Sequence, residues 1–242
     1  MMELSQRLTA VAEYVEPGSK VADIGSDHAF LPIYLLKSGR ASAAIAGEVN
    51  RGPMEAAKKN VQEAGLTHLI QVRLGDGLAV IEDGEADTVC ISGMGGSLMT
   101  TILDGGLDRL KSVQRLVLQP NVGERNVREW FFHHGWQLAG ETILKEEGII
   151  YEVLTAIPGD PNRAYRSDQW TLEQWFELGP FLWEQKSPYL RQKWQEEWDK
   201  VERVLKGLEQ AKSMEVSRKR EEMKERLRWI EEVLTCMQTV IP

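Results

Sequence analysis

The feature that most constrains this chain is a repeated pattern in which a short apolar run ends in small or acidic residues. Four successive runs have such endings, namely Asp23-Ile24-Gly25-Ser26-Asp27, Glu48, Gly75-Asp76-Gly77 and Ser92-Gly93-Met94-Gly95-Gly96. Amphipathic segments separate the runs, which is the pattern of strands alternating with helices. Open α/β sheets bind ligands at the carboxyl ends of their strands. The pattern therefore predicts an α/β sheet with a ligand site built from its first four strand ends.

Length and composition are those of a globular protein with a large domain and a smaller one. The chain has 242 residues, of which 42% are hydrophobic and 27% charged. The formal net charge is −8, with 29 basic residues against 37 acidic ones. An acidic total argues against broad coating of nucleic acid, but local basic stripes can still contact phosphates.

Several classes of protein are disfavoured by what the sequence lacks. No apolar run reaches the roughly 18 to 20 residues that cross a bilayer, and Glu3, Arg7 and Glu13 interrupt any signal-peptide core. The two cysteines form no disulfide framework, and the four histidines lack HxxxH spacing. We therefore expect a cytoplasmic protein with no membrane contact and no metal site.

The periodicity of apolar residues predicts the order of the elements. Leu4, Leu8, Val11 and Val15 share one helical face, and further helices are predicted over 54–64, 98–103 and 124–134. A fifth strand is expected at 116–119, and two more at 136–143 and 149–157. The segment 144–148 is too short for a crossover helix, so these last two strands should be antiparallel.

A change of composition at Pro158-Gly159-Asp160-Pro161-Asn162 predicts a linker and a second domain. We expect an α/β domain that carries the ligand site over 1–160 and a helical domain over 161–242. The second should begin with a short helix at 172–183, interrupted at Gly179-Pro180, and continue as two long antiparallel helices broken near 212–215. Their apolar faces predict a small coiled-coil hairpin.

The first loop indicates which cofactor the sheet could hold. A dinucleotide fingerprint would place glycine where Asp27 stands, because a carboxylate repels a pyrophosphate. The same carboxylate suits S-adenosylmethionine (SAM), which carries a sulfonium and an ammonium and has no phosphate. Glu48 is placed to bridge ribose hydroxyls, and Asp76 can accept from the adenine amino group beside Gly77. Each residue alone could be an ordinary turn or surface acid, but their joint occurrence favours a SAM site.

The ordered motifs closely resemble those of the bacterial tRNA adenine-22 N1-methyltransferase family. They are D-I-G-S-D-H-A, A-G-E, G-D-G, S-G-M-G-G and L-Q-P-N, together with the opening Leu4-Ser5-Gln6-Arg7-Leu8, Tyr151-Glu152 and the helical tail. The resemblance implies a class I methyltransferase fold, with a seven-stranded sheet whose last strand is antiparallel, and a carboxy-terminal coiled-coil domain. It also implies SAM as methyl donor, tRNA as substrate and 1-methyladenosine at position 22 as product.

The turn after the fourth strand is consistent with a ring-nitrogen acceptor. Ser92-Gly93-Met94-Gly95 stands where many amino-group methyltransferases carry an Asn/Asp-Pro-Pro-Tyr/Phe turn. N1 of adenine has its own lone pair, so no proton need leave before attack. Asp27 is then a candidate for stabilising the developing cation or accepting the N6 proton, and an equally good candidate for binding the SAM ammonium.

For each of several other candidate residues, the sequence allows either a functional role or a purely structural one. His28 could contact substrate or cap the next helix, and Arg7 could bind the SAM carboxylate or lie on the surface. Gly93, Met94 and Gly95 could form a wall beside SAM or simply begin a helix. Candidates for binding the substrate are Gln119, Pro120, Asn121, Arg125 and Arg128.

The helical tail carries six of the eight tryptophans, interspersed with basic residues. Such residues could contact tRNA phosphates, although tryptophans at helical spacing are usually core and Glu196, Glu197, Glu221 and Glu222 offset the basic runs. We expect a monomer that contacts tRNA through this tail. The competing interpretations are a methyltransferase for a small molecule or protein, and a non-catalytic RNA-binding protein with a SAM-binding fold.

Overall fold

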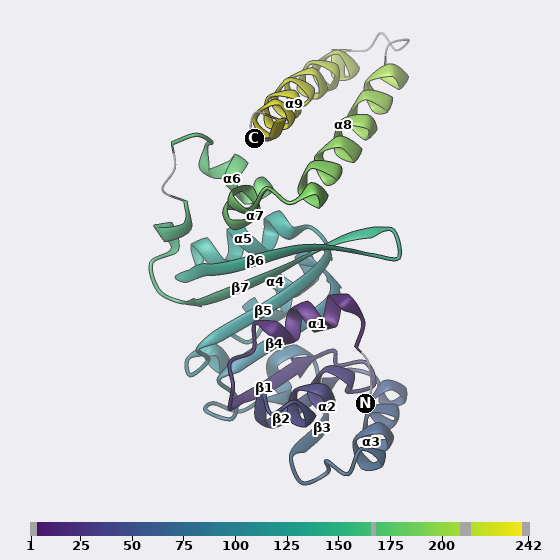
Figure 1. Cartoon of the computed structure of the whole chain (residues 1–242), viewed down its shortest axis with the longest axis vertical. Coiled ribbons are helices and arrows are strands. Elements are labelled where there is room, and N and C mark those ends of the chain that lie inside the picture. The colour runs from purple at the N-terminus through teal and green to yellow at the C-terminus, as the bar shows by residue number, and fades with distance from the viewer. Residues whose placement is uncertain (1–3, 166–167, 209–213, 239–242) are drawn as a thin grey trace. The chain divides into compact units, whose positions relative to one another are not determined.

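Seven strands form one sheet in the order β3-β2-β1-β4-β5-β7-β6 (Figure 1). The computed structural model describes residues 4–165, 168–208 and 214–238. The strands are β1 (Ser19–Ile24), β2 (Ala41–Glu48), β3 (Ile70–Leu74), β4 (Thr88–Gly95), β5 (Arg115–Val122), β6 (Trp136–Glu146) and β7 (Ile149–Pro158). β1 to β5 pair in parallel, whereas β7 runs antiparallel to both β5 and β6. The predicted α/β class, the seven strands and the antiparallel hairpin are confirmed.

Helices follow the strands at the predicted places. They are α1 (Gln6–Glu13), α2 (Phe30–Lys37), α3 (Arg51–Glu63), α4 (Gly96–Asp104), α5 (Glu124–His133), α6 (Leu172–Leu178), α7 (Pro180–Gln185), α8 (Pro188–Leu208) and α9 (Met214–Gln238). Short 3₁₀ turns occur at η1 (Gly77–Val80), η2 (Leu107–Leu110) and η3 (Pro161–Ala164). The Gly179-Pro180 interruption lies where it was expected, between α6 and α7.

Successive side chains along a strand point to opposite faces of the sheet, so the core forms two layers, one on each face. On β4, Val89 and Ile91 pack with α4 and α5, while Cys90 between them packs with α1, α2 and α3. The same alternation occurs on β5, where Leu116 and Leu118 face opposite to Val117. Because both faces are covered, the loops at the ends of the strands are the remaining place for a site.

The boundary between compact units lies later than the sequence predicted. The chain divides between Phe181 and Leu182, so residues 161–181 belong with the sheet. The reason is packing, since Phe176 of α6 is buried and meets the rings of Phe132 and Tyr165 edge to face. The composition change at 158–162 marks the end of β7 and not the end of the unit.

The second unit contains two long antiparallel helices. Trp194 of α8 meets Trp229 of α9 edge to face, and Arg220 of α9 donates to the carbonyl of Leu208 at the end of α8. Higher residue numbers on α8 therefore pair with lower residue numbers on α9, so the two helices are antiparallel. The helical hairpin is confirmed, while its description as a coiled coil stays a prediction. Part of the break expected near 212–215 lies outside the described residues.

No described helix combines the length and the apolar character that a membrane span requires.

Candidate functional site

A cavity of about 610 Å³ opens at the carboxyl ends of β1, β4 and β5. β1 has β2 on one side and β4 on the other, so the chain changes direction across the sheet at this strand. Such a switch point is where open α/β sheets bind their ligands. The first loop lines the cavity with Asp23, Gly25, Ser26 and Asp27, as the sequence predicted.

Asp23 organises the first loop from inside the protein. Its carboxylate is buried and accepts a 2.6 Å hydrogen bond from the Ser26 hydroxyl. Burial raises the pKa of Asp23 to about 7, a shift that the Ser26 hydrogen bond opposes and the nearby Glu48 carboxylate increases. The hydrogen bond between Asp23 and Ser26 therefore stabilises the loop conformation, and desolvation disfavours ionisation of the Asp23 carboxyl.

Glu48 holds the same loop from the neighbouring strand. Its Oε1 accepts a 2.5 Å hydrogen bond from the Asp27 amide, and its carboxylate is buried at the end of β2. Burial raises the pKa of Glu48, while the Asp27 amide opposes that shift. The acid predicted to bind ribose thus also fixes the backbone of the candidate catalytic residue.

The backbone of the loop is strained at three consecutive positions. Asp27, His28 and Ala29 have φ values of 38°, 70° and 58°, in the left-handed region that non-glycine residues rarely adopt. Asn60 of α3 donates a 2.9 Å hydrogen bond to the carbonyl of His28 and helps to keep this conformation. Strained residues of this kind concentrate at functional sites.

The glycine-rich turn after β4 is shaped by close approaches of backbone and side chain. A Cβ on Gly96 would collide with the carbonyl of Gly123, so the two turns cross without room for a side chain. A Cβ on Gly25 would meet the thioether of Met94, which lies against the first loop. Gly93 and Met94 line the cavity, whereas Gly95 lies beside Val122 at the end of β5. The turn therefore begins α4 and also forms one cavity wall.

Arg7 connects α1 to the strand ends across the cavity. Its Nη1 donates a 2.5 Å hydrogen bond to Gln119 Oε1, which also accepts from the Gly93 amide at 3.1 Å. Its guanidinium lies 5.6 Å over the ring of Tyr151, and both residues line the cavity. Arg7 is thus part of the site and not a plain surface residue.

Only one of the three residues predicted at the end of β5 lines the cavity. Asn121 is exposed there and donates from Nδ2 to the carbonyl of Gly93 at 2.8 Å. Gln119 and Pro120 are buried, and the Gln119 amide is occupied by Arg7, Gly93 and the carbonyl of Pro120. Gln119 and Pro120 therefore lie outside the cavity lining, and their contact with substrate stays a prediction.

The remaining cofactor candidates surround the cavity without lining it. Glu48 lies behind the first loop, and Asp76 is exposed at the end of β3. Gly77 follows with φ +52°, and a Cβ there would press on Ile102. These positions lie on the β2 and β3 side of the switch point, as expected for residues that contact one end of an elongated ligand.

His28 lies at the rim of the site. Its ring stacks on Phe30 with centroids 5.3 Å apart and planes 16° from parallel, and Phe30 lines the cavity. The His28 Nε2 atom is 3.5 Å from Asp27 Oδ1. A role for His28 in catalysis stays a prediction.

The prediction for Arg128 is wrong, because its side chain is completely buried. Its guanidinium contacts Glu141 and Glu152, each at 2.5 Å, and donates to the carbonyl of Phe176 at 3.0 Å. Burial opposes the charge, but the two carboxylates raise the pKa of Arg128 above its usual range. Arg128 therefore joins the sheet to α6 and is not available to RNA.

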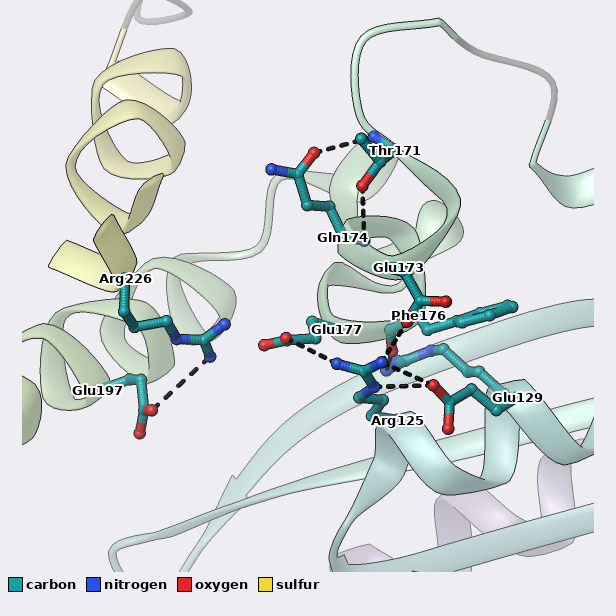
Figure 2. Close-up of polar contacts among 10 residues, drawn as sticks. Arg125, Glu129, Thr171, Glu173, Gln174, Phe176, Glu177, Glu197 and Arg226 are labelled. Atoms are coloured by element: carbon teal, nitrogen blue, oxygen red, sulfur yellow. Dashed lines mark hydrogen bonds and ion pairs between the residues drawn. The ribbon is translucent and has the colours of Figure 1, made fainter. Parts of the chain in front are cut away.

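Arg125 is half-exposed but already has three acidic partners. Figure 2 shows its guanidinium among Glu129 and Glu177, with Nη atoms 2.8 and 3.2 Å from their carboxylates, and it also pairs with Glu173. The residue lies outside the cavity lining. Its guanidinium links α5 to α6 through these ion pairs, so a contact with RNA would have to replace them.

Two aromatic residues of the cavity, Phe30 and Tyr151, were missed as site residues. Phe30 begins α2, and its position directly after the first loop is the signal that could have identified it. Tyr151 lies near the start of β7. Because β7 is antiparallel, its start lies at the edge where the parallel strands end, so the predicted hairpin already implied this position.

The arrangement can bind a cationic, elongated ligand beside a flat aromatic one. Asp23 and Asp27 face the cavity and Glu48 lies behind them, which favours sulfonium and ammonium groups and disfavours phosphates. Phe30 and Tyr151 offer ring surfaces. The described residues contain no group of three or more His, Cys, Asp or Glu side chains placed for a metal ion.

Comparisons with known proteins extend over almost the whole chain. Residues 21–232 match a sequence model of the family described as tRNA (adenine(22)-N(1))-methyltransferase. The tRNA (adenine(22)-N(1))-methyltransferase of Bacillus subtilis (strain 168) is 42% identical over 234 residues, which are 96% of this chain and 98% of that protein.

Solved structures agree with the sequence comparison. The crystal structure of the B. subtilis m1A22 tRNA methyltransferase TrmK superposes with a TM-score of 0.91, covering 97% of this chain and 100% of that one. A Streptococcus pneumoniae chain in complex with S-adenosyl-L-methionine is 40% identical, with a TM-score of 0.84 over 96% of this chain and 100% of that one. M. capricolum TrmK in complex with S-adenosyl-homocysteine is 26% identical, with a TM-score of 0.82 over 98% and 100% of the two chains.

Proposed function

This chain belongs to the tRNA (adenine(22)-N(1))-methyltransferase family, and from that membership we propose that it methylates N1 of adenine 22 in tRNA with SAM as donor. The observation that carries the assignment of the donor is the acidic cavity at the switch point, lined by Asp23 and Asp27. Carboxylates there suit a sulfonium and an ammonium, and they would repel the phosphates of a dinucleotide.

The residues proposed to hold SAM come from the first four strand ends and from α1. The first loop and Glu48 would hold the methionine and ribose portions, and the third strand end would meet the adenine. Arg7 would pair with the carboxylate of SAM from across the cavity. The complete proposed set is Arg7, Asp23, Gly25, Ser26, Asp27, Glu48, Asp76, Gly77, Gly93, Met94 and Gly95.

SAM supplies an electrophilic methyl group attached to a sulfonium. N1 of adenine attacks this methyl with its lone pair, a C–N bond forms, and the C–S bond breaks with its electrons moving to sulfur. The methylated ring is a cation until the N6 amino group releases a proton. The protein's main task is to place N1 in line with the methyl, and orientation of this kind can supply about 7 to 11 kcal/mol.

Asp27 is the residue proposed to act on the cationic ring, by stabilising it or by accepting the N6 proton. Its side chain is highly exposed beside the cavity, and its amide is fixed by Glu48. The alternative role is binding of the SAM ammonium. Asp27→Asn separates the two roles. If Asp27 only binds the cofactor, the substitution should lower SAM affinity and leave kcat at saturating SAM unchanged.

N1 lies on the Watson–Crick edge of adenine, so the target nucleotide must be unpaired or rotated out of the stack when it reacts. We propose that the helical hairpin of α8 and α9 holds the body of the tRNA. Arg191, Arg203, Lys219 and Arg228 are exposed on this hairpin and form no ion pair with another described residue. Deletion of 182–242 should then abolish tRNA binding while SAM binding persists.

We propose that the enzyme acts in the cytoplasm as a monomer. Its test is incubation of the purified protein with isotopically labelled SAM and unmodified tRNA transcripts that carry adenine or guanine at position 22. Label recovered as 1-methyladenosine only from the adenine transcript is the expected result. SAM binding without any labelling would favour the non-catalytic alternative. Light scattering during size exclusion gives the mass of the active species.

A further inference from the structure

The cavity extends well beyond the strands assigned to the cofactor. Its lining runs from the first loop after β1, through Ser92 and Gly93 of β4 and Asn121 of β5, to Tyr151 of β7. These strands are consecutive in the sheet, and three inter-strand spacings correspond to roughly 14 Å. The cofactor residues proposed on β2 and β3 lie on the other side of β1. The β5 and β7 end of the cavity is therefore the place for the methyl acceptor.

Two groups at this end have the chemistry of a purine pocket. Leu118 of β5 pairs with Leu154 of β7 in antiparallel register. Asn121 follows Leu118 by three residues and Tyr151 precedes Leu154 by three, so both lie toward the same edge of the sheet. Asn121 donates through Nδ2 to Gly93, and its amide oxygen accepts a 3.4 Å hydrogen bond from Gln119 Nε2. An amide oxygen has two lone pairs, so one remains for an amino-group donor such as N6 of adenine. Tyr151 provides an aromatic ring, and bases bind to proteins by stacking on such rings.

The ring of Tyr151 is fixed before any substrate arrives. The Arg7 guanidinium lies 5.6 Å over the ring, and Arg7 is itself held by Gln119. On the β6 side, Tyr151 pairs with Leu144 through the hairpin. The side chain is half-buried, and its accessible part borders the cavity. A ring held in this way loses little conformational freedom when a base stacks on it.

We infer that Tyr151 is the platform on which the target adenine stacks during methyl transfer. This inference rests on the proposed function and adds a positioning residue to it. It also assigns a purpose to the Arg7–Gln119 hydrogen bond, which fixes the platform relative to β4 and β5. Removal of the ring should impair use of tRNA much more than SAM binding, because the ring lies on the acceptor side of the cavity and contacts the proposed SAM-binding set only through Arg7.

The test compares Tyr151→Phe, which keeps the ring, with Tyr151→Leu, which keeps apolar bulk and loses the ring. Stacking on an aromatic side chain contributes about 1 to 3 kcal/mol per base, so Tyr151→Leu should lower kcat/KM for tRNA by about 5- to 150-fold. Tyr151→Phe should stay within about twofold of the wild type. Calorimetric SAM affinity should be unchanged in Tyr151→Phe and should fall far less than kcat/KM for tRNA in Tyr151→Leu, where Arg7 loses its ring contact. Tm should be unchanged in both variants. Tyr34→Leu, a half-buried tyrosine on α2 outside the cavity lining, is the matched control.

Three outcomes would overturn the inference. Full activity of Tyr151→Leu would show that no base stacks there, and equal losses in both variants would assign the role to the hydroxyl. A parallel loss of SAM affinity would place the ring on the cofactor side. Failure of the wild-type enzyme to label adenine 22 would remove the proposed function as well, so the two failures are distinguishable.

Discussion

Arg128 and Glu152 form an ion pair completely inside the protein, with Nη2 and Oε2 2.5 Å apart. Glu141 lies at the same distance from the guanidinium, so one buried cation faces two buried carboxylates. Arg128→Met would leave both carboxylates without their cation, and breaking such a group costs about 3 to 5 kcal/mol. We expect a Tm lowered by at least about 6 °C in a thermal melt. Arg125→Met, whose pairs are partly exposed, is the control and should cost far less.

The raised pKa of Asp23 predicts how the effect of its replacement on stability depends on pH. Burial raises this pKa from 3.8 to about 7, so between these pH values the folded protein retains a proton that the unfolded chain has lost. The contribution of this carboxyl to stability is therefore complete below pH 3.8 and disappears as pH rises to about 7. Asp23→Asn should raise the Tm of the ligand-free protein by a few degrees at pH 8 and have little effect near pH 4. A lower Tm at pH 8 would contradict the assignment of burial as the cause.

Gly96→Ala should be strongly destabilising because the added Cβ would collide with the carbonyl oxygen of Gly123. Neither backbone can shift easily, and overpacking of this kind costs about 1 to 3 kcal/mol. Gly207→Ala adds the same atom inside α8, where nothing lies within 4 Å, and should stabilise that helix by about 0.5 to 1 kcal/mol. Urea unfolding of the two variants measures both effects, and a neutral Gly96→Ala would show that the two turns can separate.

Charge substitutions in the helical hairpin test its proposed contact with tRNA. Replacing Arg191, Arg203, Lys219 and Arg228 by glutamine should weaken tRNA binding and reduce the slope of log affinity against log salt by up to about 3. The matched control replaces Lys200, Lys206, Arg218 and Lys224, each of which has a carboxylate partner on its own helix. Equal effects of the two sets in a filter-binding titration would argue against specific phosphate contacts.

The sequence was sufficient for the fold and for the acidic character of the site. Strand ends, helix faces and the short 144–148 connection determine the order and direction of the elements, because they depend on local periodicity and chain length. The loop residues Asp23, Gly25, Ser26 and Asp27 are close together in the chain, and the rule that ligands bind at the carboxyl ends of parallel strands places their loop at the site.

The direction of individual side chains could not be predicted in the same way. Arg128 resembles any surface arginine until the partners Glu141 and Glu152 are placed in space, and these lie on the two strands of the hairpin. Gln119 and Asn121 are two residues apart on β5, yet Gln119 is buried among the partners Arg7 and Gly93 whereas Asn121 is exposed. Such outcomes depend on contacts between segments distant in sequence.

The left-handed backbone of Asp27, His28 and Ala29 has a consequence for transfer of the loop between proteins. Its conformation is imposed from outside, by Glu48 at the end of β2 and by Asn60 on α3. Residues 23–29 grafted onto another sheet without these two partners would relax to a more common backbone and carry the motif without its geometry. The geometry of this site therefore depends on the loop together with Glu48 and Asn60. A short sequence match to the loop alone does not identify a site of this kind.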